Sequence, residues 1–565
     1  MDDETKTTIK KFVLQNAVKF GSAQAGKIIS KVLGEQPELR AQAKELMPII
    51  KSIVEEVNLM SEDTRVETLK KIAPEMLEEK PKEERNMFAV LGINEGDCVK
   101  TAFPPGPEKY PHIGHAKACL LNYLIAQQYK GKFVLRFEDT NPKLVKSVFY
   151  EVLLDNLAWL GVKWDELFYA SDHMDLFYEL AEKVIKSNDA YMCFCNGDAI
   201  KESRMTGVAC ECRARSVEEN MKLWKELPQY EEGKAILRLK IDLNHKNSTM
   251  KDPTIFRVLR IEHARHANKY TVWPNYDFQN AIMDGKFGVT HRVRSKEFEM
   301  RSELQTYIQN LLGLPNTTTY EFARFNMEGV LSSGRVIREQ VDSGNLTGWD
   351  DPRLTTIVAL RRRGFLPEAI KNFVVSTGMT KSESTLTWDD LILHNRRILD
   401  KTAKRYFFIS DFNKVCVKDT PEKILELESH PEKPELGKRK LKITNNFIIP
   451  TKDLAKMNSE GIYRLMDCIN FRKKENEYVF DSEDFESYKK NNGNGIFHFL
   501  GADDNNIDVE IFMNDATKLT GLAEPAVLDV KIGDVVQFER FGFCRLDSID
   551  EVDGKKVFKF WFTHK

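Results

Sequence analysis

Two histidines stand close together after a proline-rich turn, in a pattern that suits nucleotide chemistry. Residues 103–115 are F-P-P-G-P-E-K-Y-P-H-I-G-H, and a β-type run at 99–103 leads into them. Prolines stiffen the chain as it leaves the strand, and Gly114 has no Cβ to keep a base or ribose from the backbone. A strand, a tight turn and a helix in this order form the first crevice of a doubly wound sheet. The sequence therefore predicts an ATP site at this turn.

His112 and His115 indicate which chemistry to expect there. Imidazoles beside a helix N-terminus can stabilise the charge that develops on a pentavalent α-phosphorus, so the pattern favours nucleotidyl transfer over hydride transfer. The phosphate-binding motif G-x-x-x-x-G-K-[ST] does not accompany the turn. Taken alone, H-I-G-H is equally compatible with an ordinary helix entrance, so the assignment depends on the rest of the chain.

Four of the nine cysteines fall within twenty residues. Cys193, Cys195, Cys210 and Cys212 form two C-x-C pairs with fourteen residues between them. Such a set can place four thiolates around one tetrahedral zinc ion, in a structural site with no open position for catalysis. The alternatives are that the cysteines are simply buried or that they cluster by chance. Two disulfides are disfavoured in a reducing cytosol. We favour zinc, although the one-residue spacing is tighter than in the usual C-x₂-C pair.

The motifs that follow the turn occur in an order typical of one enzyme family. They are R-F-E-D-T (136–140), L-A-W-L-G-V (157–162), D-P-T-I-F-R (252–257), W-P-N-Y-D-F (273–278), G-V-T-H-R-V-R-S-K-E-F (288–298) and G-W-D-D-P-R (348–353). Together with H-I-G-H, this series resembles the class I aminoacyl-tRNA synthetases, specifically the glutamyl and glutaminyl members, and among them the archaeal-type glutamyl enzymes. The resemblance spans most of the chain.

The resemblance implies a glutamate–tRNA ligase. Such an enzyme uses ATP to activate L-glutamate as glutamyl-adenylate and transfers it to the 3′ end of tRNA(Glu). Mg²⁺ and cationic groups stabilise the departing pyrophosphate, so binding and charge placement dominate the chemistry. His112, Gly114 and His115 would then act on ATP. The cysteine cluster would belong to a zinc-binding module in the domain that grips the acceptor stem of tRNA.

The same resemblance assigns residues to the amino acid. By motif position, Tyr276, Asn280 and Arg294 contact the substrate amino acid, and Glu138 or Asp139 contacts its ammonium group or the terminal adenosine of tRNA. Glutaminyl enzymes typically have a small, uncharged residue at the position of Arg294. An arginine suits a γ-carboxylate through a charge-assisted hydrogen bond and leaves a neutral amide poorly matched, so we favour glutamate.

Two departures from the family pattern affect the expected site. The K-M-S-K-S-type loop corresponds to V-L-S-S-G-R (330–335), which keeps Ser332 but has no lysine, so that Arg335 is its nearest cation. Arginine can bind phosphate through two N–H donors, and we therefore assign Ser332 and Arg335 to ATP; read alone, the stretch is a Ser/Gly-rich turn. Ala102 stands where the family usually has an arginine that helps to bind the amino acid.

Several cations are candidates to compensate for the missing arginine. They are Lys100, Lys109, which also differs from the commoner residue of the turn, and Arg292. Two alternatives to a glutamate enzyme stay open. One is a glutaminyl-tRNA synthetase. The other is a retired, that is catalytically inactive, synthetase-like protein that binds tRNA or a partner, with the N-terminal helices as its docking element. Retention of the H-I-G-H turn, Tyr276 and Arg294 favours an enzyme. Whether tRNA(Gln) is charged as well stays open.

Apolar periodicity predicts a multidomain α/β protein with a Rossmann-like parallel sheet. The cluster Arg361, Arg362 and Arg363 suits either a solvated helix end or a patch that contacts a nucleic-acid backbone. β-type runs at 538–543, 544–552 and 556–563, with Asp553-Gly554 between the last two, predict barrel hairpins. The predicted segments are a helical appendage (1–86), a first Rossmann-like half (96–190), an insertion with the cysteine cluster (191–272), a second half with the altered loop (273–345), a connecting helical domain (346–404) and a β-barrel region (405–565). The resemblance implies that the insertion binds the acceptor stem of tRNA and that the β-barrel region binds the anticodon.

Composition limits the remaining possibilities. The chain has 565 residues, 42% of them hydrophobic, which is enough for several ordinary domain cores. Its formal net charge of −2 means that tRNA has to be bound through local basic patches. The N-terminus lacks a basic and apolar leader, and no apolar run approaches the roughly 18 residues that a membrane span needs. We expect a cytoplasmic monomer with no membrane contact.

Overall fold

The computed structural model describes residues 3–20, 22–23, 25–35, 43–76, 86–331, 333–457, 461–475, 477–503 and 505–565. The chain divides into two compact units, Met1–Asn86 and Met87–Lys565. Among the described residues, no helix is long and apolar enough to cross a bilayer.

The first unit is helical in its described part. Its apolar residues recur at helical spacing and meet in one core that includes Ile9, Val13, Ile28, Ile50 and Leu69. Because each helix has one apolar face, packing these faces together removes them from water. The helices are α1 (Asp3–Phe20), α2 (Ala25–Glu35), α3 (Ala43–Asn58) and α4 (Glu62–Ile72).

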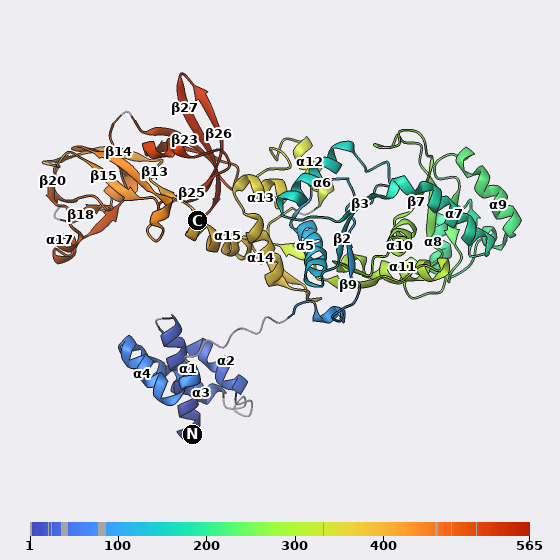
Figure 1. The fold of residues 1–565 in the computed structure, drawn as a ribbon, viewed down its shortest axis with the longest axis horizontal. Helices are drawn as coiled ribbons and strands as arrows, with labels where there is room; N and C mark the ends of the chain where they lie inside the picture. Colours follow the sequence, from blue (N-terminus) through green and yellow to red (C-terminus); the bar gives the residue numbers. More distant parts are fainter. Residues whose placement is uncertain are drawn as a thin grey trace. The chain divides into compact units, whose positions relative to one another are not determined.

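The second unit contains a parallel sheet with the strand order β3-β2-β1-β8-β9. Helix α5 (Ile113–Gln128) connects β1 to β2, and its apolar side chains share a core with the sheet. Figure 1 labels β2, β3 and β9 of this sheet, with α5 beside them. The strand order reverses between β1 and its neighbour β8, so a crevice opens there at the carboxyl ends of the strands. The strands are β1 (Lys100–Phe103), β2 (Lys132–Phe137), β3 (Glu166–Tyr169), β8 (His291–Ser295) and β9 (Thr318–Phe322).

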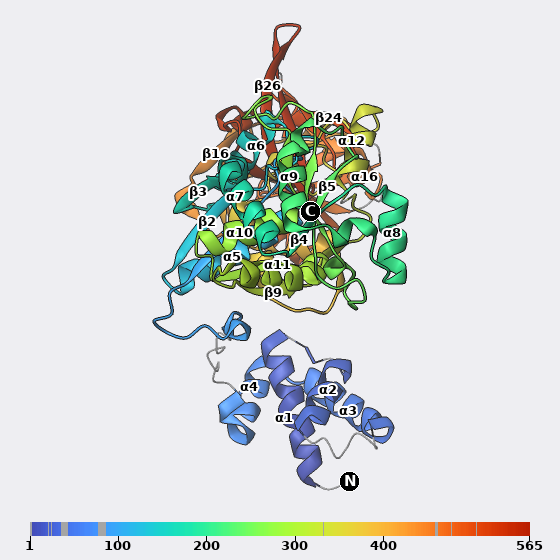
Figure 2. The same cartoon turned by 90° about the vertical axis from the view of Figure 1, so that its right-hand side faces the viewer.

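An insertion separates β3 from β8. It contains an antiparallel sheet in the order β4-β5-β6-β7, and helices α7 and α9 pack against it (Figure 2). Helix α10 (Tyr276–Lys286) then leads back to the parallel sheet, and α11 (Glu299–Leu312) packs on α10. The other elements are α6 (Ser147–Trp159), α7 (Met174–Lys186), β4 (Ala190–Cys193), α8 (Gly197–Thr206), α9 (Val217–Glu226), β5 (Ile236–Leu239), β6 (Thr254–Val258) and β7 (Val272–Pro274).

Helices α12 (Gly334–Asp342), α13 (Ile357–Arg363), α14 (Pro367–Thr377) and α15 (Trp388–Thr402) follow the parallel sheet. Two members of the arginine cluster at the end of α13 differ from both interpretations given above, because they bind groups of the β-rich region, whereas Arg361 is partly exposed and pairs with Asp155. Arg362 forms an ion pair with Asp547, and the buried Arg363 donates to the Thr563 carbonyl at 2.7 Å. These arginines therefore fasten α13 to the β-rich region, which explains why they are neither simply solvated nor free for nucleic acid.

From residue 405 onward the described residues form two seven-stranded sheets, one in the order β21-β18-β19-β20-β14-β17-β22 and one in the order β12-β25-β26-β27-β23-β24-β13, together with a two-stranded sheet of β15 (Lys423–Glu428) and β16 (Lys438–Ile443). In each seven-stranded sheet the two outermost strands are almost consecutive in the chain, since a single residue separates β12 from β13 and two separate β21 from β22. Each of these two sheets therefore curls toward closure, as in a barrel. The predicted fold class, a Rossmann-like sheet with an insertion, helices and a β-barrel region, is confirmed.

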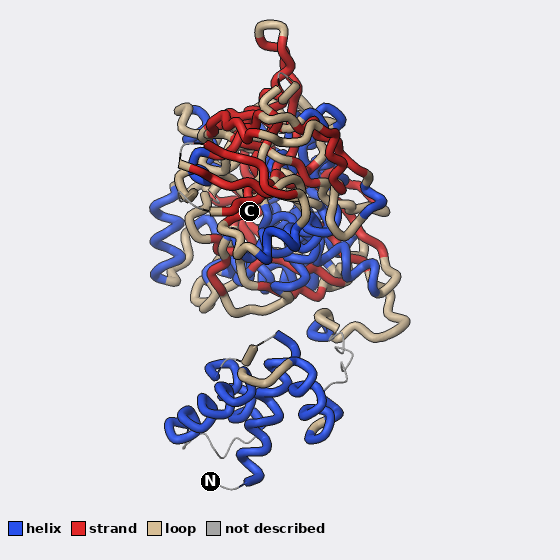
Figure 3. The backbone as a smooth tube through the Cα atoms, turned by 90° about the vertical axis from the view of Figure 1, so that its left-hand side faces the viewer, coloured by secondary structure: helices blue, strands red, loops and turns tan. Residues whose placement is uncertain are grey.

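The strands of the two seven-stranded sheets are short apart from the last hairpin. They are β12 (Arg405–Tyr406), β13 (Phe408–Ile409), β14 (Phe412–Lys418), β17 (Asn446–Pro450), β18 (Ile462–Leu465), β19 (Asn470–Lys474), β20 (Glu477–Ser482), β21 (Gly495–Phe497), β22 (Leu500–Gly501), β23 (Ile507–Phe512), β24 (Lys518–Ala523), β25 (Val535–Phe538), β26 (Gly542–Val552) and β27 (Lys555–His564). The β26–β27 hairpin projects beyond its sheet (Figures 2 and 3).

One strand prediction in this region is wrong. The run 538–543 contains a turn, since β25 ends at Phe538 and β26 begins at Gly542. Aromatic residues gave the run a β-type composition, but Arg540 takes a left-handed conformation (φ 63°) and binds Asp453 with both ends of its guanidinium group. The predicted turn at Asp553-Gly554 is correct, with positive φ at both residues as a two-residue hairpin of type I′ requires.

Candidate active site

The H-I-G-H turn forms the N-terminus of α5 through an unusual cap. The Nδ1 atom of His112 accepts the backbone N–H of Gly114 at 3.1 Å, and Nδ1 of His115 accepts that of His112 at 3.2 Å. A Cβ atom on Gly114 would lie 2.9 Å from Cε1 of His112. Glycine is therefore needed here so that the His112 ring can cap the helix, a reason that adds to the close approach of a ligand.

Both imidazoles are neutral at physiological pH. Burial, with a smaller contribution from Lys109, lowers the pKa of His112 to about 3, and burial lowers the pKa of His115 well below its usual range. Because each Nδ1 accepts a backbone N–H, the proton of each neutral ring is on Nε2. The pair can therefore donate two N–H groups to phosphate oxygens, but it supplies no net positive charge.

The segment 347–357 holds this turn in place. Ile113 donates its backbone N–H to Thr355 at 2.9 Å, and Ile357 donates to Pro111 at 2.8 Å. The ring of Trp349 stacks on Tyr110 with centroids 5.3 Å apart. The G-W-D-D-P-R motif thus has a structural role, since it buttresses the turn that presents the two histidines.

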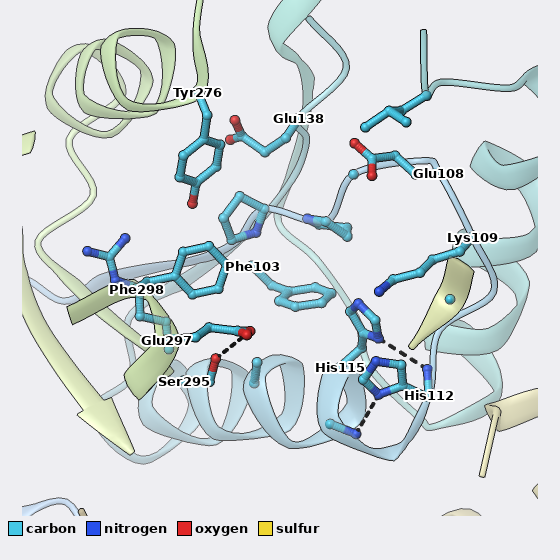
Figure 4. A pocket seen from close by; sticks show the side chains of 18 of the residues that line it. Phe103, Glu108, Lys109, His112, His115, Glu138, Tyr276, Ser295, Glu297 and Phe298 are labelled. Carbon is cyan, nitrogen blue, oxygen red and sulfur yellow. Dashed lines mark hydrogen bonds between the residues drawn. The ribbon is translucent and has the colours of Figure 1, made fainter. Parts of the chain in front are cut away.

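A cavity of about 900 Å³ opens over this turn and the carboxyl ends of β1, β2 and β8. This volume is at the upper end of the range for ligand sites. Tyr276 and Glu138 lie at one end of the cavity, and His112, His115 and Lys109 lie at the other (Figure 4). The predicted site residues that line it are His112, Gly114, His115, Glu138, Tyr276, Arg294 and Arg335.

Arg294 is a buried cation that forms no direct ion pair with a carboxylate of the described residues. Its side chain is 7% exposed and donates to Gln305 at 3.0 Å and to the Ser302 hydroxyl at 2.5 Å. None of the ion pairs found in the described part of the chain includes it. Burial, followed by the charge of Arg292, lowers the pKa of Arg294 to about 10, so it remains charged at neutral pH. The Ser302 hydroxyl also donates to the Glu321 carboxylate, so this acidic group reaches Arg294 only indirectly. A guanidinium that is buried without a direct ion pair favours an anionic ligand.

Glu138 provides the opposite charge. Its Oε1 atom accepts a hydrogen bond from Nε of Arg136 at 2.8 Å and one from the Asn280 amide at 3.3 Å. The Oε2 atom is buried and makes no hydrogen bond of satisfactory geometry, although the Gln279 side chain lies beside it. Burial raises the pKa of Glu138 despite the neighbouring Arg136. An ammonium group at the cavity would satisfy this oxygen.

Two predicted contacts lie behind the cavity wall. Asn280 is buried on α10, donates to Glu138 and accepts from Arg292, so it positions these groups. Asp139 is fully buried, and its carboxylate accepts hydrogen bonds from the hydroxyls of Tyr150 and Ser171 at 2.7 and 2.8 Å. Neither side chain lines the cavity. Of the two acidic candidates, the structure thus brings Glu138 and not Asp139 to the cavity.

The altered loop contributes little charge. Ser332 lies outside the described residues. Arg335 is on the rim of the cavity, but its side chain is 86% exposed and pairs with Glu339 at 2.9 Å. Among the cations considered for the missing arginine, Lys100 pairs with Glu166 at 2.7 Å and does not line the cavity. Arg292 does line the cavity. In the parallel pair of β1 and β8, His291 lies opposite Thr101. The next residues of the two strands, Arg292 and Ala102, are therefore neighbours.

The four clustered cysteines come together at the end of β4. Cys193 ends the strand, Cys210 precedes a 3₁₀ turn, and α8 occupies most of the loop between the two pairs. The four sulfur atoms lie within 4.8 Å of one another. Tetrahedral Zn–S bonds of about 2.3 Å place sulfurs about 3.8 Å apart, so small side-chain adjustments fit this cluster to one ion. All nine cysteines are free thiols, which leaves these four available as ligands.

Sequence patterns missed several lining residues. Lys117 is 2% exposed on α5, and its ammonium lies over the rings of Phe322 and Phe325 at 4.8 and 4.4 Å. Gln279 lines the cavity one helical turn after Tyr276. Their positions could have been found from helical spacing, because Lys117 is three residues after Gly114 and Gln279 is three after Tyr276, and both of these earlier residues line the cavity. The aromatic partners of Lys117 come from distant segments and gave no sequence signal.

Residues 98–401 match the family described as tRNA synthetases class I (E and Q), catalytic domain. Residues 403–486 and 494–547 match two families that are both described as tRNA synthetases class I (E and Q), anti-codon binding domain. The first match alone covers more than half of the chain.

Curated relatives are similar over nearly their whole length. The glutamate–tRNA ligase of Pyrococcus furiosus is 38% identical, with 97% of this chain and 98% of the relative covered. That of Pyrococcus abyssi is 39% identical over the full length of both. That of Methanothermobacter thermautotrophicus is 36% identical, with 96% of this chain and 97% of the relative covered. A crystal structure of a glutamate tRNA ligase from Elizabethkingia meningosepticum shares 18% identity, covers 54% of this chain and 70% of its own, and has a TM-score of 0.42.

Proposed function

Because this chain belongs to the class I tRNA synthetases for glutamate and glutamine, we propose that it is a glutamate–tRNA ligase. It activates L-glutamate with ATP and transfers the glutamyl group to the 3′ end of tRNA(Glu). The family match supports the ligase reaction, and the curated relatives named above support glutamate as its amino acid. We further propose that it works in the cytoplasm as a monomer, and that tRNA(Glu) contacts the β-rich region that matches anticodon-binding families.

Arg294 is the observation that carries the choice of glutamate. Its buried guanidinium lacks a carboxylate partner in the described residues, and the γ-carboxylate of glutamate would provide one. The neutral amide of glutamine would leave this charge uncompensated in a site of low dielectric. Glutaminyl-tRNA synthesis is therefore disfavoured by the same feature. Glu138, with its unsatisfied oxygen, suits the ammonium group of the amino acid or the terminal adenosine.

The chain's residues support a reaction with little acid–base chemistry. One oxygen of the glutamate α-carboxylate attacks the α-phosphorus of ATP, the bond to the β-phosphate oxygen breaks, and pyrophosphate leaves. His112 and His115 donate their Nε2–H groups to the oxygens of the α-phosphate as negative charge builds there. Mg²⁺, when it accompanies ATP, would supply further positive charge for the leaving group. Glu138, Tyr276 and Arg294 hold the amino acid in line for attack.

The proposed function is tested by glutamate-dependent exchange of labelled pyrophosphate into ATP, measured in the presence of total tRNA. We expect exchange with glutamate, and neither exchange without an amino acid nor comparable exchange with glutamine. Failure of the wild-type protein to catalyse exchange under any of these conditions would support a retired synthetase instead. Faster exchange with glutamine than with glutamate would reassign the amino acid.

We also propose that Cys193, Cys195, Cys210 and Cys212 bind one structural zinc ion. The close approach of the four sulfurs supports this site. Fresh, reduced protein should contain about one equivalent of zinc, and Cys210→Ser should lose the metal and destabilise the insertion. The matched control is Cys416→Ser, a change at an exposed cysteine outside the cluster, which should keep the metal. Wild-type protein without zinc would rule the site out.

A further inference from the structure

The phosphate end of the cavity needs a positive charge that its two histidines do not provide. Both imidazoles are neutral, and the loop at 330–335 has no lysine. Pyrophosphate leaves with several negative charges, and a cation that stays beside it stabilises the transition state. The exposed Arg335 forms an ion pair with Glu339, so its charge is already partly neutralised. Another cation is therefore expected at this end, if the chain is the ligase proposed above.

Lys109 lies where this charge is needed. It projects from the proline-rich turn, lines the cavity and extends toward the imidazoles of His112 and His115 (Figure 4). Its charge is near enough to contribute to the lowered pKa of both histidines. Its aliphatic stem passes over the first residue of α12, because a Cβ atom on Gly334 would lie 2.6 Å from Cδ of Lys109. The absence of a side chain at Gly334 thus lets a lysine from the turn cross the altered loop.

The turn and the altered loop are also tied together beside this crossing. Arg338, one turn further along α12, donates to the Glu108 carbonyl at 3.2 Å. The carboxyl group of Glu108, whose pKa is raised by burial, makes no ion pair with Lys109 in the described part of the chain. The ammonium group of Lys109 therefore remains available at the cavity, while its backbone is held close to the loop.

Lys109 differs in this respect from the other cations of the cavity wall. Arg292 and Arg324 form ion pairs with Asp284 and Glu297, and Arg257 donates to Asn275. Lys117 is held over two phenylalanine rings. Within the described residues, Lys109 makes no hydrogen bond, ion pair or contact with an aromatic ring. An unpaired ammonium in a cavity is suited to an anionic ligand.

We propose that Lys109 binds the pyrophosphate portion of ATP and replaces the lysine that the loop lacks. In this arrangement the charge comes from the turn before α5, and Gly334 provides the space for it. Lys109 transfers no proton in this step: the carboxylate displaces pyrophosphate at the α-phosphorus, and the Lys109 side chain stays beside the leaving group. The inference rests on the proposed ligase function for its catalytic part, whereas its binding part concerns ATP alone.

The test compares Lys109→Met, which keeps the stem over Gly334 and removes the charge, with Lys109→Arg, which keeps the charge. Lys146→Met is the matched control, because Lys146 is an exposed lysine next to the turn and outside the cavity. We expect Lys109→Met to lower the rate of glutamate-dependent pyrophosphate exchange about 10²–10³-fold, Lys109→Arg to retain most of the rate, and Lys146→Met to behave as wild type.

Calorimetric binding of a non-hydrolysable ATP analogue provides a second readout, which does not require ligase activity. Lys109→Met should weaken binding about tenfold or more and reduce its dependence on salt. Wild-type affinity and exchange rate in folded Lys109→Met would overturn the inference, as would an equally large loss in Arg335→Met, which would return the charge to the loop. A wild-type protein that binds the analogue but never exchanges pyrophosphate would contradict the ligase proposal, and the binding arm would still decide the role of Lys109.

Discussion

The two ends of the cavity are built differently. At the end proposed for the amino acid, Glu138 directly follows β2, while Tyr276 and Arg294 lie on α10 and β8, and buried groups such as Arg136 and Asp284 fix their neighbours through ion pairs. At the phosphate end, the groups come from a proline-rich turn and the start of a short helix. There Arg335 is exposed and the Lys109 ammonium has no partner among the described residues.

This difference shows where in a site a charged side chain can be supplied from another segment of the chain without loss of its function. The buried end depends on a network in which each charge has a fixed position, so removing one member leaves another uncompensated. A charge at the open rim can be supplied from either wall, because a long flexible side chain reaches the same phosphate from a different backbone position. We therefore expect larger effects from changes at the buried end or at the histidine pair than at the supports of the rim.

The largest effect is expected for Arg294→Met. Loss of the partner of a buried carboxylate costs about 2–5 kcal/mol, so kcat/KM for glutamate should fall strongly, whereas that for glutamine should change far less. The quantity to measure is the ratio of the two kcat/KM values with the same tRNA, because general damage to the protein cancels in it. An unchanged ratio would remove Arg294 as the specificity determinant and direct attention to Arg292.

Variants of His115 test the role of the neutral imidazole. His115→Ala should lower kcat about 10²–10³-fold, the usual cost of losing one donor to a developing negative charge, with little change in tRNA affinity. His115→Gln should retain more activity than His115→Asn, because a glutamine amide can place an N–H near the position of Nε2. Equal activities of the Gln and Asn variants would contradict the tautomer inferred from the Nδ1 hydrogen bond.

A smaller effect with a distinct pH dependence is expected for Glu138. Burial raises the pKa of this carboxyl, so it is ionised only at a higher pH than an ordinary glutamate. The ionised form binds an ammonium group, and kcat/KM should therefore fall as the pH decreases through the raised pKa. Glu138→Gln should cost about 10–100-fold at neutral pH, as for a lost hydrogen bond to a charged group, and should flatten this acid limb. If kcat/KM of the variant still fell at low pH, the titration responsible would belong to a group other than Glu138.

The smallest effect should come from a support of the phosphate end. Trp349→Leu removes the ring that stacks on Tyr110. Such pairs contribute about 0.5–1.5 kcal/mol, so KM for ATP should rise several-fold while the glutamate-to-glutamine ratio stays as in wild type. Steady-state kinetics with both substrates distinguishes the two readouts. A change in the ratio would mean that the two ends are coupled more tightly than their separate hydrogen-bond networks indicate.

The same contrast explains how far the sequence alone could predict this site. The positions of His112, Tyr276 and Arg294 follow from ordered motifs whose backbone is fixed by parallel strands and the helices after them. The sequence did not distinguish Glu138 from Asp139, because adjacent residues after a strand differ only in which one turns toward the cavity. Likewise, nothing in the chain order showed that Lys109 crosses Gly334, a contact between residues that are 225 positions apart.

Structural features were predicted correctly where the residue types of a short segment determine its backbone geometry. The hairpin turn at Asp553-Gly554 has the residue pair that its backbone geometry demands. Arg362 and Arg363 at the end of α13 were misjudged because their partners, Asp547 and Thr563, belong to strands far along the chain. The Ser/Gly-rich loop followed by α12 also carried no local signal for its contact with the turn. Tertiary contacts of this kind decide whether a cation is solvated, structural or available to a ligand.

The most direct test of the account is aminoacylation of total tRNA by the wild-type protein, with labelled glutamate and labelled glutamine in separate reactions. The account predicts that glutamate is attached to tRNA in an ATP-dependent reaction and that glutamine is not, because the unpaired guanidinium of Arg294 selects an anionic side chain. Attachment of glutamine in preference to glutamate, or of neither amino acid, would contradict it.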